Sequence, residues 1–240
     1  GDFAGVYDQL MRDVDYAAWA EYIIALFAGH DVHTVADCAC GTGEISVRLQ
    51  EAGYAVTGID RSEDMLRVAQ QKARQKGLRI PFIRQDMENL RLHKPVDAVC
   101  CACDGVNYLV EEGEARDFFS AAYTALRPGG LLLFDISSGY KFANILSGNV
   151  FGEAEEEIAF IWRNNYDEEA RLCEMELTCF VKEGQGYTRF DERHIQRAYE
   201  IDETLSMLKD AGFRKASAYR AFTLEAPAEN DERIQFVAVK

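Results

Sequence analysis

Strand-length apolar runs that alternate with helical patterns, between residues 33 and 137, constrain the fold of this chain most strongly. The apolar runs occupy 33–39, 54–59, 80–83, 96–103 and 130–136. Helical spacing of apolar residues covers 44–52, 62–76 and 113–126. The strand runs are continuously apolar, which is typical of parallel strands that helices cover on both faces. Because strand–helix–strand units cross over with one hand, the sequence predicts a doubly wound α/β sheet.

The pattern changes after residue 150. From Cys173 to Val181 every second residue is apolar, and most of the residues between them are polar. A period of two with one polar face is typical of half-exposed antiparallel strands. Gly184-Gln185-Gly186 then predicts a hairpin turn. The sequence therefore predicts an antiparallel β insertion over residues 150–198.

The chain thus divides into three expected parts. The first, 1–149, contains N-terminal helices, including one at 15–28, and the α/β core. The second is the insertion, and the third, 199–240, returns to the core. We expect the third part to supply a helix at about 201–211 and the last two strands of the core sheet, near 213–222 and 233–239.

Composition narrows the class of protein. The 240 residues are 48% apolar and 28% charged, as in ordinary soluble chains. The formal charge of −15 argues against a nucleic-acid partner. No apolar run reaches the roughly 20 residues of a membrane span. The seven cysteines are odd in number and mostly lie in apolar runs, which predicts reduced thiols in a cytoplasmic protein.

A glycine turn, Asp37-Cys38-Ala39-Cys40-Gly41-Thr42-Gly43, follows the first predicted strand. Its glycines let a ligand approach the backbone at the carboxyl end of a parallel sheet. The turn departs from the dinucleotide fingerprint, because Ser46 holds the third glycine position. Asp60 ends the second strand, where a carboxylate can accept hydrogen bonds from a ribose hydroxyl pair. Asp86 can accept from an exocyclic amine, and Met87 can lie on an adenine face.

Four motifs, in this order, resemble those of class I S-adenosylmethionine-dependent methyltransferases: Asp37 to Gly43, Gly58-Ile59-Asp60-Arg61-Ser62, Gln85-Asp86-Met87 and Leu126-Arg127-Pro128-Gly129-Gly130. The match extends over 33–137, so it is more specific than any single motif. It implies a Rossmann-like seven-stranded sheet whose last strand is antiparallel. The segment Tyr7-Asp8-Gln9-Leu10-Met11 and the insertion resemble a small-molecule branch that includes glycine and amino-sugar N-methyltransferases.

The resemblance implies S-adenosylmethionine as cofactor and S-adenosylhomocysteine as product. By resemblance, Asp37 and the backbone of Ala39, Cys40, Gly41, Thr42 and Gly43 hold the methionine part. Asp60 takes the ribose, and Arg61, Asp86 and Met87 flank the adenine. Tyr7 is a cofactor candidate by resemblance, with a packing role as its alternative.

The expected reaction is methyl transfer to a small-molecule acceptor, and the acidic chain favours an amine. A neutral amine needs positioning more than acid–base chemistry, whereas a hydroxyl acceptor needs a base. Asp104, Tyr108 and His194 are the candidates for that base, although a half-exposed, hydrogen-bonded histidine is the simpler interpretation of His194. No metal is expected, since cysteines in apolar runs are most simply interpreted as buried small hydrophobes.

Two other functions stay open on the sequence. An NAD-dependent oxidoreductase would use the same glycine turn and Asp60, although Ser46 and Asp86-Met87 count against it. A non-catalytic module that binds S-adenosylmethionine would carry the same motifs. We expect the insertion to cover the acceptor site, to form a homodimer surface, or both.

Overall fold

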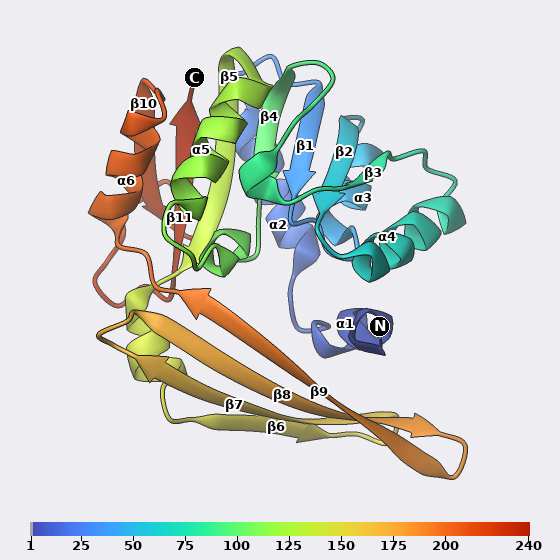
Figure 1. The fold of residues 1–240 in the computed structure, drawn as a ribbon. Coiled ribbons are helices and arrows are strands. Elements are labelled where there is room, and N and C mark those ends of the chain that lie inside the picture. Colours follow the sequence, from blue (N-terminus) through green and yellow to red (C-terminus); the bar gives the residue numbers. More distant parts are fainter. Residues whose placement is uncertain (1) are drawn as a thin grey trace.

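The computed structural model describes residues 2–240, with side chains from Phe3 onward, and contains two β-sheets (Figure 1). The larger sheet has the strand order β10-β11-β5-β4-β1-β2-β3. Its strands are β1 (Thr34–Cys38), β2 (Ala55–Asp60), β3 (Phe82–Arg84), β4 (Val96–Cys101), β5 (Leu126–Ser137), β10 (Lys215–Arg220) and β11 (Arg233–Val239). Strand β11 is antiparallel to both neighbours, and the pairs among β1 to β5 are parallel. The predicted doubly wound sheet with an antiparallel last strand is therefore confirmed.

Helices cover both faces of this sheet. On one face lie α2 (Tyr16–Phe27) and α3 (Glu44–Glu51), with α4 (Glu63–Gln75) beside α3. On the other lie α5 (Glu114–Ala125) and α6 (Ile201–Asp210). The sheet separates two apolar clusters, one around Phe118 and Phe134 and one around Ile23 and Leu133. Each such buried side chain stabilises the fold by about 1.5–3 kcal/mol.

Local sequence fixes the helix starts beside the glycine turn. Ser62 is the N-cap of α4, and its hydroxyl accepts from the backbone N–H of Met65 at 3.3 Å. Gly43 precedes α3 with φ +79, a left-handed conformation. A Cβ at Gly43 would lie 2.9 Å from Cβ of Ala69, so both the backbone angle and the packing require glycine there.

The second sheet is antiparallel throughout, in the order β6-β7-β8-β9. Its strands are β6 (Val150–Ala154), β7 (Ile158–Asp167), β8 (Leu172–Glu183) and β9 (Gly186–Arg197). Glu183 pairs with Gly186, so the hairpin turn itself is Gly184-Gln185, with Gly184 at φ +60. Figure 1 shows α1 (Asp2–Leu10) between this sheet and the core.

Some elements differ from the predicted ones. Strand β5 begins at Leu126 rather than 130, because Leu126 already pairs with Val96 of β4. Gly129 N–H also donates to Lys240 O at 3.1 Å. Three short helices were not predicted: η1 (Met87–Asn89), η2 (Gly105–Tyr108) and η3 (Lys141–Leu146). They are too short to give a periodic apolar pattern. None of the helices in residues 2–240 combines the length and apolar character that a membrane span needs.

Candidate active site

Two adjoining hollows lie at the carboxyl ends of the parallel strands. The large hollow has a volume of about 330 Å³ and is lined by Phe3, Tyr7, Ala39, Gly41, Asp60, Arg61, Ser62, Met65, Gln85, Asp86, Met87, Glu88, Cys103, Gly105, Tyr108, Leu109, Glu192 and His194. The small hollow, of about 50 Å³, is lined by Tyr7, Tyr16, Asp37, Ala39, Cys40, Gly41, Thr42, Glu44, Ile45, Ala102 and Cys103. Four residues, Tyr7, Ala39, Gly41 and Cys103, line both, so the hollows meet there.

The carboxylate of Asp60 is fixed by backbone donors at the edge of the large hollow. Gly41 N–H donates to its Oδ2 at 2.8 Å, and Ser62 N–H donates to its Oδ1 at 2.8 Å. Gly41 can donate in this way because its backbone turns through φ +53. Each carboxylate oxygen keeps a second acceptor position, so Asp60 can still receive two hydroxyl donors.

Asp37 is a buried carboxyl at the wall of the small hollow. It is 2% exposed, and Ser46 donates its hydroxyl to Oδ2. Burial raises the pKa of Asp37 to about 7, although the hydrogen bond from Ser46 opposes this. The residue that departs from the dinucleotide fingerprint therefore serves as the donor to Asp37.

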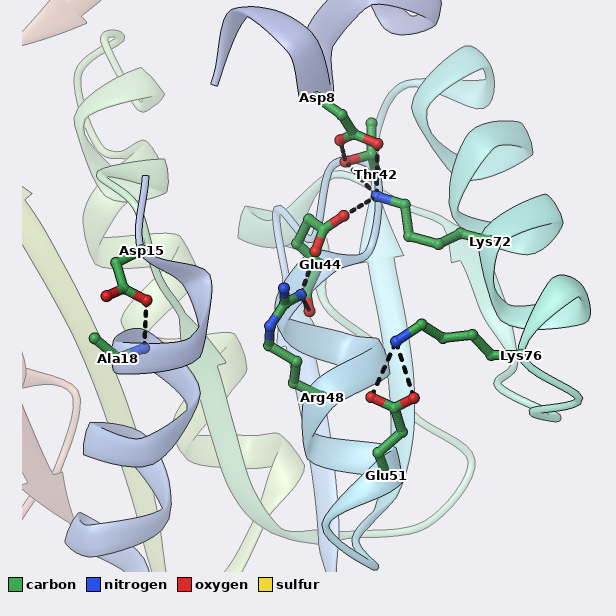
Figure 2. A network of polar contacts seen from close by, with 9 residues as sticks. All are labelled: Asp8, Asp15, Ala18, Thr42, Glu44, Arg48, Glu51, Lys72 and Lys76. Atoms are coloured by element: carbon green, nitrogen blue, oxygen red, sulfur yellow. Dashed lines mark hydrogen bonds and ion pairs between the residues drawn. The ribbon is translucent and has the colours of Figure 1, made fainter. Parts of the chain in front are cut away.

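A polar network fastens α1 to the glycine turn (Figure 2). Thr42 donates its hydroxyl to Asp8 at 2.5 Å, and Lys72 of α4 pairs with Asp8 at 2.7 Å. Lys72 also pairs with Glu44, which in turn binds Arg48. Burial alone would raise the pKa of Glu44, but Lys72 and Arg48 outweigh it and lower that pKa. The network ties three separate segments together beside the small hollow.

Aromatic side chains from α1, η2 and β9 close the large hollow. The His194 ring lies 5.2 Å from Phe3 and 5.9 Å from Tyr108, between ring centroids. Tyr7 packs edge-on against Phe3, and burial raises the pKa of its hydroxyl well above the usual value. Burial, and secondarily Arg61, lowers the pKa of His194, so this imidazole is neutral near pH 7.

Asp104 lies outside the lining of both hollows, unlike the other two base candidates. Its Oδ2 accepts from Ser137 Oγ at 2.8 Å and from Arg233 at 3.3 Å. Its backbone N–H donates to Asp135 at 3.0 Å. The side chain is therefore engaged behind the wall, whereas Tyr108 and His194 line the large hollow.

The predicted cofactor residues gather around the two hollows, with one exception. Gly43 lines neither, and its place is the turn that begins α3. The sequence did not single out several lining residues, among them Phe3, Tyr16, Cys103 and Glu192. Cys103 ends an apolar strand run and directly precedes Asp104, and this position at a strand end could have indicated a lining residue. Phe3, Tyr16 and Glu192 carried none, because only tertiary packing brings their elements to the sheet edge.

Comparison with known proteins identifies the family. A family model described as a methyltransferase domain matches residues 35–130. A putative methyltransferase of Geobacillus sp. (strain WCH70) is 41% identical over 99% of this chain and 98% of its own length. The crystal structure of an S-adenosylmethionine-dependent methyltransferase from Clostridium acetobutylicum ATCC 824 is 31% identical, with a TM-score of 0.90 over 99% of this chain and 97% of its own. This chain belongs to the S-adenosylmethionine-dependent methyltransferases.

A more distant relative of this methyltransferase is the glycine/sarcosine N-methyltransferase of Parasynechococcus marenigrum (strain WH8102). It is 32% identical over 140 residues, which are 56% of this chain and 49% of the relative. Membership of this family decides against the two alternatives that the sequence left open, an oxidoreductase and a non-catalytic module. The enzyme uses S-adenosylmethionine.

The residues present fit this cofactor. Asp60 has acceptor positions for hydroxyls, and Met87 and Leu109 supply apolar surface for a flat base. The small hollow combines the Asp37 carboxyl with the glycine turn, a donor set suited to an ammonium and a carboxylate. The chain therefore offers a matching group for each polar part of S-adenosylmethionine.

Proposed function

We propose that this methyltransferase methylates the nitrogen of a small-molecule amine. The adenosine part of the cofactor lies in the large hollow and the methionine part in the small one. The observation that carries this placement is that the hollows share Tyr7, Ala39, Gly41 and Cys103. Sulfur joins the adenosyl and methionyl parts, so it lies beside these four residues.

Each predicted cofactor residue has a role in this arrangement. Asp60 binds the ribose hydroxyls, while Arg61, Asp86 and Met87 surround the adenine. Asp37 pairs with the ammonium, and the backbone from Ala39 to Gly43 holds the rest of the methionine part. Tyr7, which lines both hollows, closes the site from α1.

Charge supports an amine acceptor. Besides Asp60 and Asp86, which the cofactor engages, the large hollow is lined by the carboxyl side chains of Glu88 and Glu192, against one guanidinium, that of Arg61. Such a wall attracts cations and repels anions. The relative named glycine/sarcosine N-methyltransferase supports nitrogen as the acceptor atom.

Little proton chemistry is needed from the chain. When bound, S-adenosylmethionine supplies a methyl group already activated by the sulfonium. Asp60 and Asp37 would hold the cofactor by its ribose and its ammonium, so that its methyl group would face the amine nitrogen and S-adenosylhomocysteine would leave as the product. The neutral His194 imidazole can then take the proton that the methylated nitrogen releases. Positioning supplies most of the acceleration, about 7–11 kcal/mol when alignment is good.

Calorimetric titration tests the cofactor placement. The wild-type chain should bind S-adenosylhomocysteine and not NAD. Asp60→Ala should weaken that binding by about 1–3 kcal/mol without unfolding the protein, because the ribose loses its acceptor. Asp210→Ala, which removes an exposed carboxylate paired with Arg116, is the matched control. Unchanged affinity in folded Asp60→Ala would mean that the ribose lies elsewhere.

An acceptor screen tests the amine proposal. Formation of S-adenosylhomocysteine should be measured with panels of small amines, phenols and carboxylic acids. We expect turnover with amines and a fall in kcat for His194→Gln. Turnover restricted to phenols or acids would contradict nitrogen methylation while leaving the cofactor site intact.

We also propose a cytoplasmic location and a homodimer. All seven cysteines are free thiols, as expected in a reducing compartment. The edge strand β6 exposes Val150 and Phe151, which a second copy could cover. Light scattering on the purified chain distinguishes a monomer from a dimer.

A further inference from the structure

The chain turns tightly just after β4, where the two hollows meet. Cys103 and Asp104 are consecutive non-glycine residues with φ +61 and +55. L-residues rarely adopt this conformation unless surrounding contacts hold them in it. A Cβ on Gly105 would lie 2.6 Å from Cys101 Sγ and 3.0 Å from Ala39 Cβ. The 103–105 turn is thus pressed against the glycine turn.

A partly buried charged cluster, made by Asp104, Asp135 and Arg233, holds this turn from behind. Asp104 N–H donates to Asp135 at 3.0 Å. Arg233, the first residue of β11, forms ion pairs with both carboxylates, that to Asp104 at 3.3 Å. Its guanidinium also lies over the ring of Trp19, 5.5 Å from the centroid. Neither Asp135 nor Arg233 lines a hollow, so the cluster acts through the turn.

The two carboxylates of this cluster depend on Arg233 for charge balance. Asp135 is fully buried, and its Oδ1 has no hydrogen-bond partner among residues 2–240. Lys141 is a further cation nearby, with Nζ 3.3 Å from Ser137 Oγ, but one lysine does not balance two carboxylates. Loss of Arg233 would therefore leave excess negative charge inside the protein.

The field of the cluster reaches the place where the hollows meet. Cys103 lines both hollows and directly precedes Asp104. Burial raises the pKa of the Cys103 thiol; Asp135 and Asp104 raise it further, and Arg233 opposes them. The same charges act on whatever occupies the space beside Cys103.

We propose that Arg233 is a positioning residue for methyl transfer: it fixes the 103–105 turn and neutralises the two carboxylates beside the sulfur position. The inference rests on the cofactor placement proposed above. Methyl transfer removes the positive charge from sulfur, so an unbalanced carboxylate there would stabilise the bound cofactor more than the transition state. Arg233 prevents this unproductive ground-state stabilisation.

The preference for S-adenosylmethionine over S-adenosylhomocysteine measures this field directly, because the two differ in the charge on sulfur. Both dissociation constants should be determined by calorimetry on the full chain at pH 8.5. Arg233→Met should raise the preference for S-adenosylmethionine by about three- to tenfold, the effect of one unbalanced charge partly screened by the protein. In Arg233→Lys, which keeps the charge, the preference for S-adenosylmethionine should stay within twofold of the wild-type value.

Asp135→Asn provides the opposite test. It removes a negative charge while keeping an acceptor of the same shape, so it should lower the preference for S-adenosylmethionine. Loosening of the fold would weaken both ligands alike and leave their ratio unchanged. Arg116→Met on the exposed face of α5 removes the same charge remotely and should not alter the ratio.

If the ratio of the two dissociation constants is unchanged in folded Arg233→Met, the proposal is overturned. If that variant does not fold, an unchanged ratio in Asp135→Asn would overturn it equally. Wild-type protein that binds neither ligand would instead refute the cofactor placement, and the inference with it.

Discussion

At the scale of single residues, burial changes the pKa of a carboxyl group in the site, that of Asp37. Asp37 lies next to the end of β1 and Asp60 ends β2, yet only Asp37 is enclosed. Burial raises the pKa of Asp37 to about 7. In the ligand-free protein this raised pKa favours the protonated form. Asp37 therefore contributes stability at low pH that is lost as pH rises from about 4 to 7.

Ligand affinity should have the opposite pH dependence. An ammonium in the small hollow needs the Asp37 carboxylate, so affinity for S-adenosylhomocysteine should fall by up to about tenfold per pH unit below 7. Calorimetry from pH 5.5 to 8 measures this change. Asp37→Asn should bind weakly and with a much flatter profile. A flat profile in the wild type would place the ammonium away from Asp37.

At the scale of elements, α1 is a short helix held mainly by side-chain contacts. Its Phe3 and Tyr7 close the hollows, and Asp8 fastens it to Thr42 and Lys72 (Figure 2). Partly buried ion pairs of this kind add to local stability, although each contributes little to the whole fold. We therefore expect α1 to control how fast the cofactor leaves.

Lys72 of α4 and Lys76, which follows the last residue of that helix, test this role. Lys72→Ala leaves Asp8 facing Glu44 without their shared cation, so S-adenosylhomocysteine should dissociate about three- to tenfold faster. Lys76 pairs only with Glu51 among the contacts in Figure 2, and Lys76→Ala should leave the rate within twofold of wild type. Stopped-flow displacement measures both rates. Equal rates for the two variants would argue against the role of α1.

At the scale of the whole molecule, Asn107 joins the two sheets. Its side-chain N–H₂ donates to Ser137 O at 3.1 Å and to Arg197 O at 2.8 Å, and its Oδ1 accepts from Ser137 N–H at 2.9 Å. Ser137 ends β5 and Arg197 ends β9, so one buried amide holds both connections between the core and the second sheet.

Loss of this amide should destabilise the protein strongly. Asn107→Ala leaves buried backbone groups of Ser137 and Arg197 unpaired, which should lower the free energy of unfolding by about 2–4 kcal/mol. Denaturant titration measures the change. Asn144→Ala is the matched control, since that exposed amide makes a hydrogen bond to Tyr140 O. Similar stability in both variants would show that the sheets are joined elsewhere.

Local patterns in the sequence were enough to predict the sheet and the cofactor side of the site. Continuous apolar runs, glycines and strand-ending carboxylates act through short-range geometry, so Gly41, Asp60 and Asp86 could be located before any contact was known. The carboxyl ends of parallel strands meet at one edge, and this rule alone brings such residues together.

The tertiary structure decided the rest, because it depends on contacts between residues far apart in the chain. The approach of α1, α2 and β9 to the sheet edge makes Phe3, Tyr16 and Glu192 part of the walls. The antiparallel pairing of β11 with β5 brings Arg233 to Asp104, 129 residues away in sequence. Periodicity describes only how each element packs locally. The burial and charge balance of Asp37, Asp135 and Arg233 arise only when the elements assemble.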